Sequence, residues 1–262
     1  MKVKITPNMY KAISVVALPL ASLYLMWRSR KQPAYRHFWD ERFAWSTFPL
    51  KTHRPRVWLH AVSVGETNAA KPLLAAILAQ WPDCDVLLTH MTPTGRDAGK
   101  ALVNMAPDRI VQCYLPYDAP YAVRKFFRQT RPTMGIIMET EVWPNLISEA
   151  NKMGIPMVLA NARESEKSRE QAARVMELMR PAFESFAVIL AQSEEDKARF
   201  VSLGAKNVVV CGSLKFDISP NVSQVAAARD WKNRLTRPVA LVASTRAGEE
   251  LQFAQALAQN IE

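Results

Sequence analysis

The sequence predicts a doubly wound α/β fold, in which helices cover both faces of a parallel sheet. Seven short apolar runs recur between residues 57 and 212, and stretches with helical spacing separate them. Each run is apolar at consecutive rather than alternate positions, which is typical of strands buried on both faces. This alternation of strand and helix is typical of doubly wound sandwiches. The expected strands are Val57–Val62, Val86–Met91, Ile110–Leu115, Met134–Thr140, Met157–Asn161, Val188–Gln192 and Val208–Gly212.

Several of the expected helices carry start signals. Ser193 is followed by Glu194 and Glu195, and acidic residues are favourable in the first turn of a helix. Thr94 lies three residues before Asp97, which indicates a cap at Thr94. The helices are expected to begin near Glu66, Thr94, Ala119, Trp143, Ser168 and Ser193.

The residues after Asp217 predict a connector and the beginning of a second α/β domain. Residues Ile218–Arg237 form a polar stretch with helical character, Val239–Ser244 is a further expected strand, and a helix opens at Gly248–Glu250. One strand and one helix cannot bury a core by themselves, so we expect a truncated second domain. The alternative is that these elements pack back on the first domain as a complete protein.

The positive charge of the chain is concentrated near its beginning. The formal net charge is +10. Residues 1–56 hold eleven Lys or Arg and two acids, a balance of +9, whereas the rest of the chain is close to neutral. A nucleic-acid-binding protein usually spreads its basic residues over a face of the fold, so we expect no nucleic acid partner. A basic arm beside an apolar segment instead indicates a membrane surface.

The apolar segment is Ala12–Trp27, which is uncharged and contains Pro19. A spanning helix needs about 20 apolar residues, so this segment is marginal, and whether it spans the bilayer or lies in its interface stays open. Tyr24 and Trp27 are typical interfacial aromatics, and three basic residues follow: Arg28, Arg30 and Lys31. A cleaved signal peptide is the alternative, but no small-residue cleavage site follows. We therefore expect an uncleaved anchor that holds the body on the cytoplasmic leaflet.

The chain is thus expected to have three parts. The first is an apolar anchor and basic arm, the second is one α/β domain, and the third is the connector with one β-α unit of a second domain. Their bounds are 1–56, 57–217 and 218–262.

Polar residues follow the first two expected strands at their carboxyl ends, where open α/β sheets bind ligands. After the first strand, Ser63 and Gly65 precede Glu66, and Gly65 allows a tight turn. Glu66 alone has a simple explanation, because acids favour helix starts and most only cap them. After the second strand, the hydroxyls of Thr92 and Thr94 are suited to binding an anion, although they are also ordinary turn residues.

The later strands end in further polar and charged residues. Glu139 and Glu141 stand at the end of the fourth strand, beside a Trp-Pro turn, where burial is costly without hydrogen bonds. Others follow the fifth and seventh strands, namely Asn161, Arg163, Ser165, Ser213, Lys215 and Asp217. Several strand ends therefore bring polar residues to one rim, and this convergence supports a site more strongly than any single residue does.

Several function classes are disfavoured by missing motifs. The first strand is followed by SVGETNAA rather than by GxGxxG, which disfavours a dinucleotide-dependent oxidoreductase. The sequence has no P-loop motif and no GxSxG elbow. The four His are not spaced as a metal site, and the three Cys form no CxxC pair. A transferase that uses a carboxylate base, with no metal or other cofactor, fits what remains.

Eight segments of the sequence, in order along nearly the whole chain, resemble the bacterial Kdo transferases, which add 3-deoxy-D-manno-octulosonic acid (Kdo) to lipid A in lipopolysaccharide assembly. METEVWPN at 138–145 and GSLKFD at 212–217 are long and specific. The other segments are HAVSVGET at 60–67, MTPTG at 91–95, YLPYD at 114–118, ANARES at 160–165, AQSEEDKARFVSLGAKNV at 191–208 and ASTRAGEE at 243–250.

The resemblance implies the N-terminal Rossmann-like half of a two-domain GT-B-type glycosyltransferase. In that family the N-terminal half receives the lipid A precursor, the C-terminal half holds CMP-Kdo, and transfer inverts the anomeric carbon without a metal. Glu66 corresponds to the general base, and Glu139 and Lys215 correspond to residues that stabilise the transition state. Substrate contacts are expected from the rest of the rim, namely Ser63, Gly65, Thr92, Thr94, Glu141, Arg163 and Ser213.

The sequence departs from the family pattern in two respects. Arg246 stands where the family commonly has His. The family's main cytidine contacts lie further along than residue 262, so we expect weak or no CMP-Kdo binding and no turnover by these residues alone. The expected partners are the lipid A precursor, CMP-Kdo and anionic lipids on the cytoplasmic side of the cell inner membrane. The alternative is a membrane-associated, acceptor-binding fragment without catalysis.

Overall fold

The computed structural model describes residues 4–50, 52–217 and 220–260, and the chain divides into two compact units, residues 1–218 and 219–262. Lys2 and Lys51 of the basic arm, and position 218 where the connector was expected to begin, lie outside the described residues.

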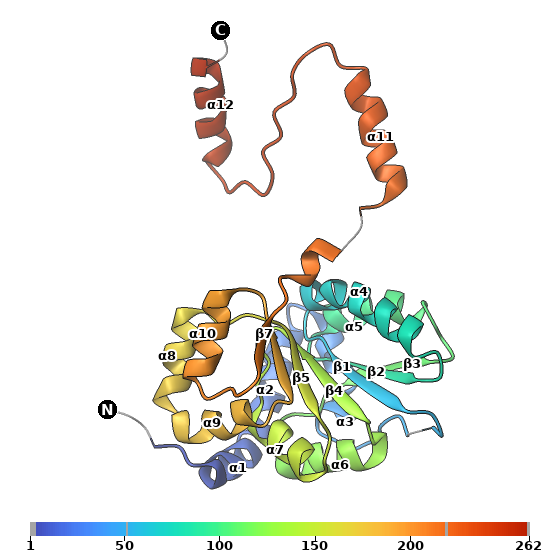
Figure 1. Cartoon of the computed structure of the whole chain (residues 1–262), viewed down its shortest axis with the longest axis vertical. Helices are drawn as coiled ribbons and strands as arrows, with labels where there is room; N and C mark the ends of the chain where they lie inside the picture. Colours follow the sequence, from blue (N-terminus) through green and yellow to red (C-terminus); the bar gives the residue numbers. More distant parts are fainter. Residues whose placement is uncertain (1–3, 51, 218–219, 261–262) are drawn as a thin grey trace. The chain divides into compact units, whose positions relative to one another are not determined.

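The first unit is built on a seven-stranded sheet in which every pairing is parallel (Figure 1). The strand order is β3-β2-β1-β4-β5-β6-β7. All seven predicted strands form, with ends that differ by at most two residues from the prediction, so the doubly wound α/β fold is confirmed. The strands are β1 (Arg56–His60), β2 (Asp85–His90), β3 (Ile110–Tyr114), β4 (Met134–Met138), β5 (Met157–Ala162), β6 (Val188–Ala191) and β7 (Val208–Val210).

Helices cover both faces of the sheet. Successive side chains of a strand point to opposite faces, and here both faces carry apolar side chains that need to be covered. In β1, Val57 and Leu59 pack on one face and Trp58 packs on the other. The first face is covered by α4 (Val64–Gln80) and α5 (Pro93–Val103). The second is covered by α6 (Pro120–Thr130), α7 (Pro144–Lys152), α9 (Met176–Glu184) and α10 (Glu194–Ser202).

Trp58 is the largest fully buried side chain of the core, and its size limits which residues fit beside it. Its ring meets Phe126 and Phe127 of α6 edge-on, and its indole Nε1 donates to Thr89 Oγ1 at 2.8 Å. On β4, a Cβ at Gly135 would stand 2.7 Å from the Trp58 ring, so only glycine fits beside it. Large and small side chains thus interlock across adjacent strands.

Two predicted helix starts are wrong in detail. The cap of α5 is Thr92, whose Oγ1 accepts from Gly95 N at 3.0 Å, and not Thr94, which is exposed in the first turn. The stretch expected to start near Ser168 forms two helices, α8 (Glu166–Arg174) and α9, which meet at Val175. Val175 has φ −121°, outside the helical range, and this breaks the helix there. The predicted start at Ser193 is confirmed.

The arm begins with two helices, α1 (Pro7–Val16) and α2 (Leu18–Ser29), which are bent by 48° relative to each other. Neither helix is long and apolar enough to cross a membrane alone, although the bent pair meets that test by length and composition. A 3₁₀ turn, η1 (Pro33–Arg36), and α3 (Trp39–Arg42) lead on to the sheet.

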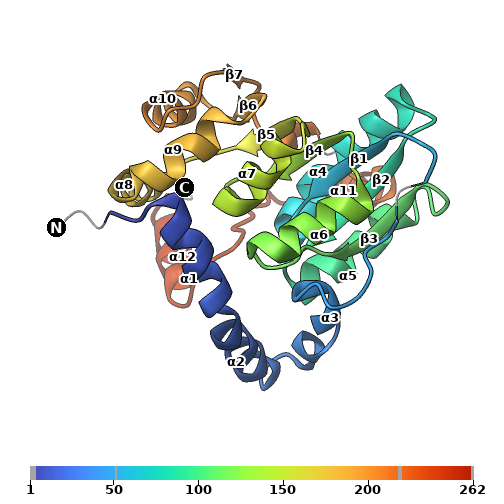
Figure 2. The same cartoon turned by 90° about the horizontal axis from the view of Figure 1, so that it is seen from below.

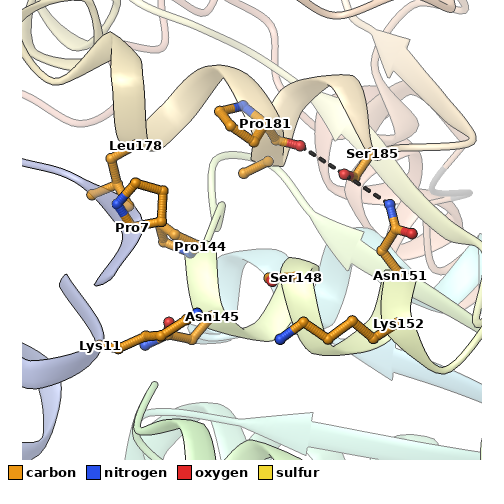
Figure 3. A pocket seen from close by; sticks show the side chains of 11 residues that line it. Pro7, Lys11, Pro144, Asn145, Ser148, Asn151, Lys152, Leu178, Pro181 and Ser185 are labelled. Carbon is orange, nitrogen blue, oxygen red and sulfur yellow. Dashed lines mark hydrogen bonds between the residues drawn. The ribbon is translucent and has the colours of Figure 1, made fainter. Parts of the chain in front are cut away.

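The first helix packs against the body of the domain, beside α9 and α6 (Figures 1 and 2). Tyr10 donates its hydroxyl to Asp118 Oδ2 at 3.0 Å, and Asn145 Nδ2 donates to Ser14 Oγ at 3.1 Å. Helices α1, α7 and α9 enclose a cavity of about 190 Å³, in which Asn151 and Ser185 are hydrogen-bonded (Figure 3). The beginning of the arm is therefore joined to the sheet domain through polar contacts.

The second unit holds two helices, α11 (Val222–Asn233) and α12 (Glu249–Asn260), which confirm the helical connector and the helix expected near Gly248. The strand predicted at Val239–Ser244 is wrong, because these residues have no regular secondary structure and Ser244 has φ +59°. A strand needs a neighbour to satisfy its N–H and C=O groups, and no strand pairing is present among the described residues 220–260.

Candidate functional site

The strand order places a crevice at the carboxyl end of the sheet. From β1 the chain moves to β2 and β3 on one side, then returns to β4 on the other side of β1. Because the connections on either side of β1 and β4 lead away from each other, the loops after these two strands leave a space between them. The loop after β1 leads to Glu66, and β4 is followed at once by Glu139.

Glu66 lies in the first turn of α4 and is 9% exposed. Its Oε2 accepts from Val62 N at 2.7 Å, and its Oε1 accepts from Ser63 Oγ at 3.0 Å. Ser63 in turn accepts from Glu66 N as the helix cap. This reciprocal arrangement holds the carboxyl in one position.

Burial raises the pKa of Glu66 from 4.5 to about 7, against the lowering effect of its bonds to Val62 and Ser63. The nearby carboxyl groups of Glu141 and Glu139 raise the pKa further, because their negative charges disfavour a third. Capping alone would stabilise the ionised form and lower the pKa. Burial therefore outweighs the capping contacts of Glu66, and a carboxyl that titrates near neutral pH is suited to general base catalysis.

Glu139 follows β4 in a left-handed conformation, with φ +59°. This region is unfavourable for a residue other than glycine or asparagine, and such conformations are enriched at functional sites, although Phe38, Ala44 and Arg131 adopt it elsewhere in the chain. The buried carboxylate of Glu139 pairs with Arg163 at 3.1 Å, where the guanidinium is 58% exposed. Glu141, two residues on, accepts from Trp143 Nε1 at 2.7 Å. The loop after β4 thus presents two carboxylates and, through the ion pair, a partly exposed cation.

The turn after β7 comes next to this group through Asn161 at the end of β5. Asn161 Oδ1 accepts from Leu214 N at 3.1 Å, which ties the two strand ends together. Leu214 opens a 3₁₀ turn, η2 (Leu214–Asp217), and packs on the core beneath α4. Lys215 is exposed in that turn, and Ser213 Oγ accepts from Lys215 N at 3.4 Å. The turn that carries Lys215 contacts α4, the helix that carries Glu66.

Two of the predicted rim residues have roles that differ from the prediction. The hydroxyl of Thr92 donates to Val62 O at 2.8 Å and caps α5, so it joins the first two loops rather than facing outward. Gly65 lies inside the first turn of α4 with a negative φ, so it forms no tight turn. A Cβ there would meet only Ser63 Oγ, at 3.8 Å, and the helix start is therefore open at this point. Thr94 is exposed at the start of α5.

Reasoning from the sequence missed several buried charged residues, Asp118 and Arg42 among them. Asp118 accepts from Asn145 N and Leu146 N at the start of α7, and burial raises its pKa to about 7. It is the last residue of YLPYD, a segment noted only for its resemblance to the family. Arg42, counted as part of the basic arm, is 1% exposed and lies 3.7 Å above the ring of Tyr114. Neighbouring Glu41, which pairs with Arg96, was the signal that this part of the arm folds inward.

The family model described as 3-deoxy-D-manno-octulosonic-acid transferase (kdotransferase) matches residues 37–218. A protein of Bordetella pertussis named 3-deoxy-D-manno-octulosonic acid transferase is 41% identical over 91% of this chain and 56% of its own length. A Haemophilus influenzae protein of the same name is 30% identical over 92% of this chain and 57% of its own length. The chain thus spans about half the length of these curated relatives.

Among solved structures, the UDP-GlcNAc 2-epimerase of Neisseria meningitidis, bound to UDP-GlcNAc, covers 78% of this chain and 54% of its own. Its sequence is 12% identical to this chain, and the TM-score is 0.46. The family match covers the whole of the sheet domain, including every rim residue described above. The chain therefore belongs to the Kdo transferase family.

Proposed function

We propose that this chain is the acceptor-binding half of a GT-B-type enzyme that transfers Kdo from CMP-Kdo to the lipid A precursor lipid IV-A, with inversion. The observation that carries the proposal is a buried carboxyl, Glu66, whose pKa is raised to about 7 beside the crevice of the sheet. A base with this pKa is partly ionised at neutral pH, and it is also basic enough to favour proton transfer from a hydroxyl group.

In the proposed reaction, the ionised Glu66 takes the proton of an acceptor hydroxyl while the hydroxyl oxygen bonds to the anomeric carbon of Kdo. The bond between that carbon and the CMP phosphate oxygen breaks, and the phosphate leaves with the bonding electron pair. Attack from the face opposite the phosphate inverts the anomeric carbon. The proton on Glu66 then passes to solvent, which restores the base.

The charged residues around Glu66 suit this reaction. Lys215 and the exposed guanidinium of Arg163 are cations that can offset the charge of the departing phosphate or of the Kdo carboxylate. Glu139, held by Arg163, can stabilise positive charge that develops at the anomeric carbon. Around them, hydroxyl, amide and carboxylate groups are available to the sugars, on Ser63, Gly65, Thr94, Glu141 and Ser213.

We also propose that the arm holds the enzyme on the cytoplasmic face of the cell inner membrane, against anionic lipids. Large apolar side chains of α1 and α2 are exposed, Val16, Leu20 and Leu23 among them. Basic residues lie at the end of α2 and just after it, where they can meet lipid phosphates, namely Arg28, Arg30 and Lys31.

The activity is tested with a chimera, in which residues 1–262 are followed by the remaining C-terminal part of the Bordetella pertussis relative. Transfer of Kdo from CMP-Kdo to lipid IV-A is measured for the chimera and for its Glu66→Gln and Lys152→Gln variants. We expect transfer by the chimera, a loss of at least about 100-fold with Glu66→Gln, and little change with Lys152→Gln on the far side of the domain. Undiminished transfer by Glu66→Gln would exclude Glu66 as the base.

The membrane proposal has its own test. Flotation with vesicles of anionic or neutral lipid is measured for the 262-residue chain and for the double variant Arg30→Glu, Lys31→Glu. Each basic residue near an anionic surface contributes about 1 kcal/mol, so the double variant should bind anionic vesicles at least about 20-fold more weakly. Equal binding to neutral vesicles would show that anionic lipids have no part.

A further inference from the structure

Asn161 combines two backbone features that no role so far explains. It has φ +53°, in the left-handed region, although it lies within β5. The register between β5 and β6 shifts between Leu159 and Ala162, which marks a bulge around Asn161. Bulges redirect side chains at strand ends and are frequent next to active sites. The neighbouring strand β4 also ends in a left-handed residue, Glu139.

Asn161 is 3% exposed, and its side chain and backbone together connect the ends of β5, β6 and β7. Its Oδ1 accepts from Leu214 N at 3.1 Å, after β7. Its backbone oxygen accepts from Gln192 Nε2 at 2.8 Å, after β6. Its Nδ2 is buried without a hydrogen-bond partner among the described residues. Asn161 is therefore held through its acceptor oxygen, which binds Leu214 N.

The contact to Leu214 helps to hold the turn that carries Lys215. Leu214 N is the first amide of η2, and Lys215 is the next residue. The Lys215 side chain is exposed and has no ion pair in the described part of the chain, so its position depends on the backbone turn that carries it. Within the described part of that turn, two other hydrogen bonds are local: Phe216 N donates to Ser213 O at 3.1 Å, and Lys215 N donates to Ser213 Oγ at 3.4 Å.

We propose that Asn161 is a positioning residue, which holds the η2 turn through Leu214 N so that the Lys215 ammonium faces the site of Glu66 and Glu139. The bulge and the left-handed backbone of Asn161 serve this contact, because they aim Oδ1 along the sheet edge toward η2. This inference rests on the proposed function, in which Lys215 stabilises the transition state.

Two substitutions separate the side chain from the backbone. Asn161→Gly accepts φ +53° without strain but removes the amide, so its effect reports the side chain alone. Asn161→Asp keeps an oxygen that can accept from Leu214 N, while it replaces the donor group and adds an ionisable carboxyl group. The matched control is Gln192→Ala, which removes the other hydrogen bond to Asn161 and leaves Leu214 N untouched.

The first measurement is amide hydrogen exchange by NMR on the 262-residue chain. In Asn161→Gly, the amides of Leu214 and Lys215 should exchange about tenfold faster, since a hydrogen bond that holds them is lost. The amide of Cys211, bound to Ala191 O, is the internal reference and should not change. Asn161→Asp and Gln192→Ala should keep slow exchange at Leu214. Unchanged exchange in Asn161→Gly would overturn the proposal.

The second measurement is Kdo transfer by the chimera. Asn161→Gly should lower kcat about tenfold with the KM for lipid IV-A changed by less than about twofold, because only the transition state loses an interaction. Faster exchange at Leu214 with an unchanged kcat, or an equal loss of kcat in Gln192→Ala, would overturn the role in positioning Lys215. If the unsubstituted chimera transfers no Kdo, the proposed function fails, whereas the exchange measurement still decides whether Asn161 holds the turn.

Discussion

The raised pKa of Glu66 predicts how the stability of the chain depends on pH. Burial raises this pKa from 4.5 to about 7, so the folded state holds a proton that the unfolded state has released over that interval. The free energy of unfolding therefore falls as the pH rises from about 4.5 through about 7. A pKa difference of roughly 2.5 corresponds to a loss of about 3 kcal/mol across the whole interval.

The substitution Glu66→Gln removes this titration and keeps the shape of the side chain. Glutamine has one acceptor oxygen, so it keeps a bond to Val62 N or to Ser63 Oγ and loses the other, at a cost of about 1 kcal/mol that does not depend on pH. The informative quantity is therefore the change in stability with pH, and not the stability at any one pH.

Urea unfolding of the 262-residue chain at about pH 5 and about pH 8.5 measures this quantity. Between these two pH values, the free energy of unfolding should fall by about 2.5 kcal/mol more in the original chain than in Glu66→Gln. At the lower pH, Glu66 is still largely protonated in the folded state. Asp118 titrates in the same range, but it is present in both proteins and its contribution cancels. The same pH dependence in both proteins would refute the reasoning that burial controls the Glu66 carboxyl.

Three further predictions follow from single contacts. Tyr10→Phe removes the hydroxyl that donates to Asp118, so the free energy of unfolding measured in urea should fall by about 1 kcal/mol relative to the original chain. Trypsin should also cleave within α1 faster than it does in the original chain. Glu139→Gly relieves the left-handed backbone, so it should be about 1 kcal/mol more stable than Glu139→Ala while both fail to transfer Kdo in the chimera; equal stability would contradict the strain. Gly135→Ala places a methyl group 2.7 Å from Trp58 and should lower the unfolding free energy by about 2 kcal/mol, which thermal or urea unfolding can measure.

The errors of prediction have identifiable physical causes. Thr92 and Thr94 are both reasonable caps from sequence, and the choice of Thr92 follows from its second bond, to Val62 O of the neighbouring loop. Gly65 was assigned to a tight turn because glycine is common in turns, yet its helical backbone needs no glycine. Arg42 was counted as a surface charge, but stacking on Tyr114 makes its burial possible. The outcomes at Thr92 and Arg42 depend on residues distant in the chain, Val62 and Tyr114.

Periodicity and local chemistry by themselves determined the strands, most helices and the edge of the sheet at which polar residues gather. These features depend on burial on two faces of each strand and on residues close together in the chain, so a sequence carries them directly. The order of the strands, the raised pKa of Glu66 and the contact from Asn161 to Leu214 were decided only by the tertiary structure. The physical reason is that desolvation and hydrogen bonding across strand ends depend on groups brought together by the whole sheet, up to 53 residues apart in the last case.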